Sequence, residues 1–285
     1  MNDKKNKMTF KTSQGETIEI ALEVITPKMA IEYLKANKNN RPIKKRSLFM
    51  YCRDIEAGNW KVNGESIKFD RHGNLGDGQH RLQACVRTGI AIETFVVRAL
   101  DPEINKTVDK GVKRTAADYL SFKNVSNSAL IAAAICRYKS LANSASDTPR
   151  DKSEMFSTSE VAEVYQQDSE FFDNVAMFAK NIYKRNRLLK AAYVAGLMAF
   201  LVREKKHPQE KVERFFAQIA DIETACSAVR VLRQKLMLNQ ADKVNSMNSI
   251  AKEIVIKRAW NAYCTGRDIK TLSYNLERDK NLQFL

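Results

Sequence analysis

The distribution of glycine is the feature that most limits how this chain can fold. The sequence holds 10 glycines in 285 residues, and eight of them lie at or before Gly111. Glycine adopts the positive-φ backbone that tight turns between short strands require. A long stretch that is poor in glycine is more typical of successive helices. We therefore expect a mixed α/β domain (α+β, with a small mixed sheet) over residues 1–123 and an all-α helical bundle domain over residues 124–285.

Local patterns predict individual elements in both parts. Alternating or β-branched runs predict strands over 17–24, 66–70 and 92–100. Helices are predicted from Thr26-Pro27 to residue 36, after Pro42 (with Ile43 facing inward) and over 79–87. In the second part, Ser157-x-x-Glu160 forms a capping box. The apolar run 188–202 predicts a central helix, and a last helix over 250–263 ends near a glycine.

The charge balance indicates a polyanionic partner. Lys and Arg number 48 against 33 Asp and Glu, which gives a net charge of +15. Both predicted domains carry part of this excess, and dense basic stretches occupy 41–46, 110–114 and 184–187. Binding to a polyanion releases condensed counterions from its phosphates, so a strongly basic chain favours nucleic acid. We expect DNA to be the partner.

Other features exclude several classes of protein. No apolar run reaches the roughly 20 residues that a membrane helix needs, and no hydrophobic segment of a secretory signal follows the basic N-terminus. The five cysteines are odd in number and never in CxxC spacing, which predicts reduced thiols in the cytoplasm. The sequence leaves open whether the protein is a monomer or a homodimer.

One short segment concentrates chemistry-bearing side chains, running from Asp77 through Gly78, Gln79 and His80 to Arg81. A strand and a glycine turn deliver the chain into a helix here, and the free amides of a helix start attract anions. Arg81 adds a forked donor for phosphate oxygens, while His80 exchanges protons near neutral pH. We expect a phosphate-binding pocket in which Asp77, Gln79 and His80 are catalytic candidates and Gly78 and Arg81 bind phosphate.

Carboxylates near this turn predict a metal site. Glu65 precedes the strand predicted over 66–70, and Asp70 ends it, shortly before Asp77. Mg²⁺ prefers oxygen ligands and retains several waters, so Asp77, Glu65 and Asp70 are candidate ligands for Mg²⁺ or another divalent metal. An alternative is that Asp70 opens the turn at Gly73. Whether a nucleotide serves as a cofactor also stays open.

Further basic residues complete the predicted site. Arg41 precedes a proline that restricts its backbone, which suits a side chain directed toward a ligand. Lys110 and Arg114 are further candidates for contacts to phosphate or DNA. Near the C-terminus, we expect Trp260 to pack in the core and Lys257 and Arg258 to stay in solvent.

The segment 77–81 resembles the DGQHR signature of the ParB/sulfiredoxin-like superfamily. The order of further motifs is similar to a branch found in phages and other mobile elements: Thr26-Pro27, Asn40-Arg41-Pro42, Tyr51-x-x-Asp54-Ile-x-x-Gly58-x-Trp60, Ile67-x-Phe69-Asp70-x-x-Gly73-x-Leu75, Asp109-x-Gly111-x-x-Arg114-Thr115 and Lys257-Arg-Ala-Trp-Asn261. The resemblance implies a ParB/sulfiredoxin-like first domain that binds nucleotide or DNA at the strand–turn–helix. It also implies that the loop around residues 109–114 closes over the site.

Two departures limit what the resemblance implies. Partition proteins carry a Gly-Glu-Arg-Arg run that holds CTP, whereas this chain has Gly78-Gln-His-Arg81. Sulfiredoxins place a cysteine beside the motif, whereas Cys85 lies further into the helix. Neither CTP gating nor sulfinic acid reduction is therefore implied.

Three functions fit these residues. We favour a Mg²⁺-dependent DNA endonuclease, a nickase, in which the carboxylates hold the metal, His80 assists proton transfer, and Arg81 and Arg41 stabilise phosphate charge. The first alternative is a non-catalytic DNA-binding or nucleotide-responsive regulator. The second is a nucleotide-dependent phosphotransferase, although a small substrate does not require a charge of +15.

Overall fold

The computed structural model describes residues 7–38, 40–103, 114–144, 156–221, 226–242, 244, 246–279 and 281–285. The chain divides into two compact units, Met1–Lys113 and Arg114–Leu285. We expected the boundary near residue 123. It lies earlier because the helix Ala116–Phe122 (α4) packs against helices of the second unit and places Leu120 in a core there.

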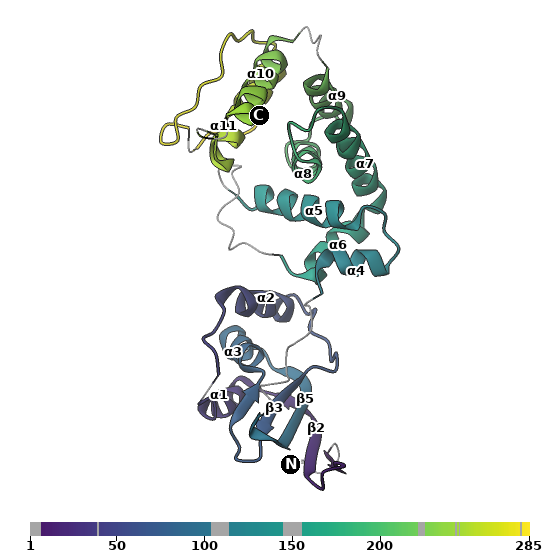
Figure 1. Cartoon of the computed structure of the whole chain (residues 1–285), viewed down its shortest axis with the longest axis vertical. Helices are drawn as coiled ribbons and strands as arrows, with labels where there is room; N and C mark the ends of the chain where they lie inside the picture. The colour runs from purple at the N-terminus through teal and green to yellow at the C-terminus, as the bar shows by residue number, and fades with distance from the viewer. Residues whose placement is uncertain are drawn as a thin grey trace. The chain divides into compact units, whose positions relative to one another are not determined.

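The first unit contains a small mixed sheet and three helices. Its strands are β1 (Lys7–Lys11), β2 (Thr17–Ile25), β3 (Ser66–Asp70), β4 (Leu75–Asp77) and β5 (Ile92–Leu100), in the spatial order β1-β2-β5-β3-β4. Only the pairing of β3 with β5 is parallel among these strands. The helices are α1 (Pro27–Lys35), α2 (Lys45–Glu56) and α3 (Gln79–Thr88), and α3 packs against both others (Figure 1). The predicted α/β character of this part is confirmed.

Local signals explain most of these elements. The Thr26 hydroxyl accepts a hydrogen bond from the Met29 amide at 3.3 Å, and Pro27 opens α1 as predicted. Ile67, Leu82 and Val96 are fully buried between the sheet and the helices. Ile43 is 36% exposed, so its predicted inward position is wrong: α2 starts only at Lys45, after an extended segment. Strand β1 was not predicted, because every one of its residues is exposed.

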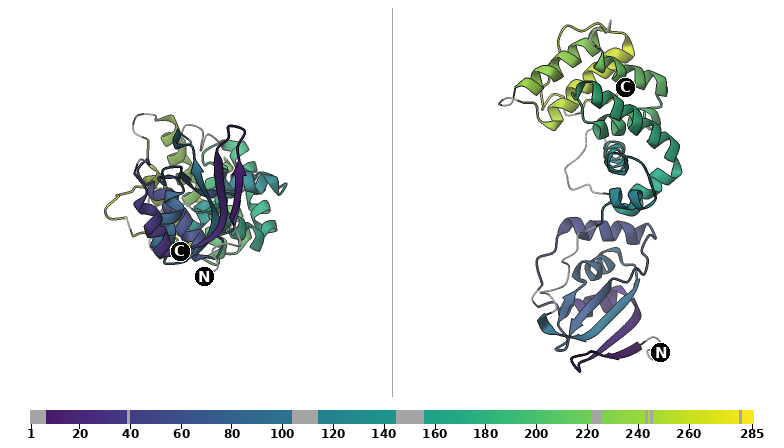
Figure 2. Two further views of the ribbon diagram at one scale, coloured as in Figure 1. Left: turned by 90° about the horizontal axis from the view of Figure 1, so that it is seen from below. Right: turned by 45° about the vertical axis from the view of Figure 1, so that its right-hand side comes forward.

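The second unit is helical over its described residues. It contains α4, α5 (Ser128–Ala142), α6 (Thr158–Gln167), α7 (Ser169–Asn186), α8 (Ala191–Arg203), α9 (Gln209–Ala220), α10 (Ser227–Ala241) and α11 (Ser249–Thr265) (Figure 2). The predicted capping box of Ser157 and Glu160 is present at the start of α6. Within the described ranges, no helix combines the length and the apolar character needed to cross a membrane.

Helix α8 is the central helix of this unit, as its apolar sequence predicts. Residues 194–201 are all buried, and Gly196 allows α5 to approach closely. A Cβ at Gly196 would lie 2.5 Å from the Arg137 Cβ and 2.7 Å from the Ala134 carbonyl oxygen. The two helices can therefore pack at this distance only around a residue without a side chain.

A buried polar cluster joins α5, α8 and α11. Glu253 on α11 is 1% exposed and forms an ion pair with Arg137 on α5. The Tyr193 hydroxyl donates to the same carboxylate at 2.7 Å. Burial, together with the Glu253 charge, raises the pKa of Tyr193 well above its ordinary value. A buried charge is tolerated only when it is paired. The cluster therefore fixes the positions of the three helices relative to one another.

The motif 257–261 on α11 holds the C-terminal segment. Trp260 is fully buried, as expected, but Lys257 is only 1% exposed and donates to the Leu282 carbonyl at 3.0 Å. Arg258 contacts the Asp279 carboxylate at 2.6 Å. The expectation that Lys257 stays in solvent is wrong, because Asp279 and residues 281–285 fold back over α11 and cover it.

Candidate nucleic-acid interface

Gly78 sets the geometry of the turn between β4 and α3. Its φ of +100° is accessible to glycine at little cost, and a Cβ there would lie 2.4 Å from the Ile67 Cδ1. The backbone therefore lies directly against β3. The Gly78 amide donates to the Asp77 Oδ1 at 2.7 Å, and Gln79 begins the helix.

The next two motif residues contact the segment that links α1 to α2. The Asn37 Nδ2 donates to the Gln79 Oε1 at 3.1 Å, and the Gln79 Nε2 donates to the Arg41 carbonyl at 2.8 Å. The Lys44 amide donates to the His80 Nε2 at 2.9 Å. Gln79 is 5% exposed, so both ends of its amide are used inside the protein. Gln79 and His80 thus hold the linking segment at both ends.

Asn40 adds a third attachment of this segment. Its Nδ2 donates to the Asn37 Oδ1 at 2.7 Å and to the Leu75 carbonyl at 2.6 Å. The Leu75 amide in turn donates to the Ala36 carbonyl at 2.9 Å. The described part of the linking segment is therefore tied to β4 and α3 along its length.

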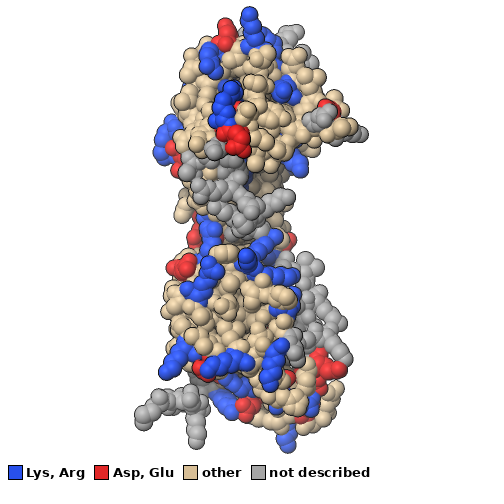
Figure 3. Space-filling model, turned by 90° about the vertical axis from the view of Figure 1, so that its left-hand side faces the viewer, with Lys and Arg blue, Asp and Glu red and all other residues tan. Residues whose placement is uncertain are grey.

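The fixed segment displays a group of cations. We call residues 41–46, which include Arg41, Lys44, Lys45 and Arg46, the basic segment; each of them is exposed. Helix α2 starts within it, without a side-chain cap and without an acidic residue in its first turn. Lys and Arg are prominent on the surface of the first unit that Figure 3 shows. Uncapped first-turn amides beside cations form an arrangement that binds phosphate.

Aromatic and basic groups continue along α2. Phe49, one turn after the basic segment, is 42% exposed, and the Arg87 guanidinium of α3 lies 4.6 Å from its ring centroid. A planar guanidinium over an aromatic ring is a stabilising cation–π contact. The contact places Arg87 of α3 against the second turn of α2.

Asp77 and Arg81 form ion pairs with neighbouring charges. The Lys68 Nζ lies 2.8 Å from the Asp77 Oδ2, and an Arg81 guanidinium nitrogen lies 3.3 Å from the same oxygen. A second Arg81 nitrogen lies 3.6 Å from the Glu65 carboxylate. Arg81 is 6% exposed. A divalent metal at Asp77 would therefore have to displace a cation that is already bound.

Asp70 forms a turn and does not join the other carboxylates. Its carboxylate accepts hydrogen bonds from the His72 amide, the Asn74 amide and the Asn74 side chain at 2.8 to 2.9 Å. Burial alone would raise the pKa of Asp70, but these hydrogen bonds lower it below its ordinary value. Among the described residues no group of three or more His, Cys, Asp or Glu side chains is arranged to hold a metal ion. The structure thus fits the alternative expectation for Asp70, that it opens the turn at Gly73.

Two further predicted residues are Lys110 and Arg114. Lys110, like the predicted loop residues Asp109 and Gly111, is outside the described residues. Arg114 belongs to the second unit, where its guanidinium lies 5.3 Å from the Phe122 ring centroid.

Several residues that build this site were not predicted. Lys68 contacts Asp77 because the two face each other in the β3–β4 pairing, and only the strand register reveals this. Asn37 was missed because its partner is 42 residues away. For this site, the sequence itself shows only the dense run of basic residues at 41–46. No protein-family model, curated protein or solved structure matches the chain.

Proposed function

We propose that this protein binds DNA, and that the basic segment at the start of α2 contacts the phosphate backbone. The observation that carries the proposal is that Gln79 and His80 fix the backbone of a segment whose four cations are all exposed. A segment held in place loses little further conformational entropy when it binds. Phosphate contacts by Lys, Arg and helix-start amides position a protein on DNA without reading its sequence.

In this proposal the motif residues position the interface, and they do not bind the ligand themselves. Both amide atoms of Gln79 are engaged, and the His80 Nε2 accepts a backbone amide. A ring nitrogen that already accepts a hydrogen bond is not available to a ligand, so the His80 Nε2 is engaged within the protein. The polar residues are concentrated at 77–81 because this turn forms several hydrogen bonds and ion pairs with neighbouring segments.

Cleavage by a Mg²⁺-dependent mechanism has weaker support than binding. Lys68 and Arg81 already neutralise Asp77, and Asp70 is committed to its turn. The nickase hypothesis from the sequence depends on Asp77 and Glu65 holding a metal together. In the structure, Arg81 contacts both carboxylates. The non-catalytic alternative requires no metal and uses residues that are exposed.

The proposal is tested with a labelled DNA duplex titrated at several salt concentrations. In the variant K44Q/K45Q/R46Q we expect the affinity to fall about tenfold or more near physiological salt, and the slope of log K against log salt to decrease by about 2 to 3. The matched control is K11Q/K28Q/K61Q, which removes the same charge from exposed positions elsewhere in the first unit. Equal losses in both variants would contradict a specific interface.

A second arm tests positioning. The variant H80A keeps all four cations but removes the acceptor for the Lys44 amide. We expect weaker DNA binding together with faster hydrogen exchange at residues 41–46. Incubation of supercoiled plasmid with protein and Mg²⁺ distinguishes binding from cleavage. Relaxation of the plasmid that is abolished in D77A would show that the function is cleavage and would contradict the proposal.

A further inference from the structure

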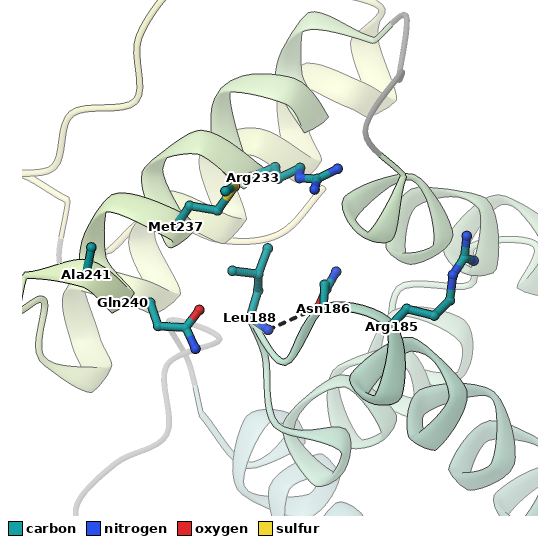
Figure 4. A pocket seen from close by; sticks show the side chains of 7 residues that line it. All are labelled: Arg185, Asn186, Leu188, Arg233, Met237, Gln240 and Ala241. Carbon is teal, nitrogen blue, oxygen red and sulfur yellow. Dashed lines mark hydrogen bonds between the residues drawn. The ribbon is translucent and has the colours of Figure 1, made fainter.

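The second unit contains a cavity that the proposed interface does not use. Its volume is about 420 Å³, within the range of about 300–1,000 Å³ that is typical of small-molecule sites. It lies between the C-terminal end of α7 and the helix α10 (Figure 4). The residues that line it are Arg185, Asn186, Leu188, Arg233, Met237, Gln240 and Ala241.

Arg233 is the cation of this lining that forms no ion pair with the described residues, and its side chain is partly exposed. Its Nη1 is buried and has no hydrogen-bond partner among the described residues. Figure 4 shows its guanidinium extending from α10 across the space toward the α7 side. A guanidinium nitrogen that is shielded from water and lacks an acceptor is costly. An anion beside the guanidinium would reduce that cost.

Two other polar residues of the lining, Arg185 and Asn186, already bind other groups of the protein. Arg185 contacts the Asp221 carboxylate at 2.6 Å. The Asn186 Nδ2 donates to the Ile219 carbonyl at 3.2 Å, and the Asn186 Oδ1 accepts a hydrogen bond from the Leu188 backbone amide at 3.0 Å. Arg233 is therefore the cation of this lining that is left to bind an anion.

Apolar atoms make up the rest of the lining. Leu188 comes from the loop after α7, and Met237 and Ala241 come from α10. Methionine adapts its shape and makes favourable contacts with aromatic rings. The exposed amide of Gln240 lies beside them and offers both a donor and an acceptor. The cavity thus combines one cation outside any ion pair, Arg233, with an apolar surface and the exposed amide of Gln240.

We propose that this cavity binds a phosphate monoester with a planar, largely apolar body, of the size of a nucleoside monophosphate. The phosphate oxygens accept hydrogen bonds from Arg233, whose planar fork matches them in geometry. The ring contacts Leu188 and Met237, and Gln240 hydrogen-bonds to the polar edge of the ring. The site lies entirely in the second unit and does not depend on DNA binding by the basic segment.

Calorimetric titration of the full chain tests the proposal, with adenosine monophosphate, cytidine monophosphate, adenosine and inorganic phosphate as separate probes. We expect the monophosphates to bind more tightly than adenosine or phosphate alone. In R233M the affinity for the monophosphates should fall about 10- to 100-fold, the effect of losing hydrogen bonds to a charged group. The matched control is R230M, which removes an exposed arginine one turn earlier on α10 and should leave the affinity unchanged.

Further variants keep the test decisive. Met237 is half exposed, so M237E should fold and should abolish binding by placing a carboxylate beside the phosphate. The variant K44Q/K45Q/R46Q should bind the monophosphates as the unmodified protein does, which separates this site from the DNA interface. Absence of binding at millimolar monophosphate, or equal binding by R233M and R230M, would overturn the proposal. Binding of inorganic phosphate as tight as that of the monophosphates would overturn the role of the apolar surface.

Discussion

At the scale of single residues, neighbouring side chains of one motif perform different tasks. Asp77 neutralises Lys68 and Arg81, Gln79 joins two points of the linking segment, and His80 accepts the Lys44 amide. Except for the Asp77–Arg81 pair, these contacts join residues that lie nine or more positions apart in the sequence. The turn at Gly78 brings them to the elements that they contact, so the backbone at this residue determines the site.

We predict that G78A destabilises the first unit more than G73A does. Both glycines have positive φ, but a Cβ at Gly73 meets no atom within 4 Å, whereas one at Gly78 meets the Ile67 Cδ1 at 2.4 Å and its Cα at 3.2 Å. Backbone strain should cost about 1–2 kcal/mol in G73A, and the clash should bring G78A to about 2–4 kcal/mol. Hydrogen exchange of the α3 amides in urea measures both. Equal costs would show that Ile67 moves aside freely.

At the scale of elements, the contact of α11 with Asp279 depends on charge. Asp279 is nearly buried and accepts hydrogen bonds from the Asn275 amide and from Arg258. Burial alone would raise the pKa of Asp279, but these hydrogen bonds and the Arg258 charge lower it below its ordinary value of 3.8. A carboxylate with a lowered pKa stabilises the fold at neutral pH, and this contribution is lost as the pH falls through the folded-state pKa.

The variant D279N should therefore show a pH-dependent loss of stability. At neutral pH we expect it to lower the free energy of unfolding of the second unit by about 1–3 kcal/mol, since the hydrogen bonds to a charged group are lost. The difference from the unmodified protein should shrink as the pH falls below 3.8, because Asp279 becomes protonated in both states. Urea unfolding across this pH range measures it. A difference that is constant with pH would contradict the role of the charge.

At the scale of the whole molecule, each hydrophobic core lies within one of the two units. One core contains only residues from Ile25 to Val96, and the other two contain only residues after Arg114. Since each core is built within one unit, neither unit needs the other to bury its apolar side chains.

We predict that a fragment of residues 114–285 folds alone. It should show helical circular dichroism and unfold cooperatively in urea, with a midpoint close to that of the second unit in the full chain. It should also retain monophosphate binding, because every residue that lines the cavity lies in this unit. A fragment that unfolds without a cooperative transition would show that the first unit contributes to the second core.

The sequence by itself determined the elements whose signals are local. The cap at Thr26-Pro27, the capping box at Ser157 and Glu160, the β-branched strand β5 and the glycine after α11 each depend on residues a few positions apart. Their hydrogen bonds form within one turn or follow directly from side-chain shape, so the pattern alone is sufficient. The basic segment was also visible, because charge needs no partner to be counted.

Only the tertiary structure decided which distant groups meet. The pairs of Gln79 with Asn37, Lys68 with Asp77 and Lys257 with the Leu282 carbonyl depend on the register of strands or on a chain segment that folds back. The burial of a polar side chain, and hence whether it is free to bind a ligand, follows from the packing of the whole unit. Sequence spacing contains no such information, and for this reason the contacts that Asp77, Gln79 and His80 make inside the first unit were not predicted.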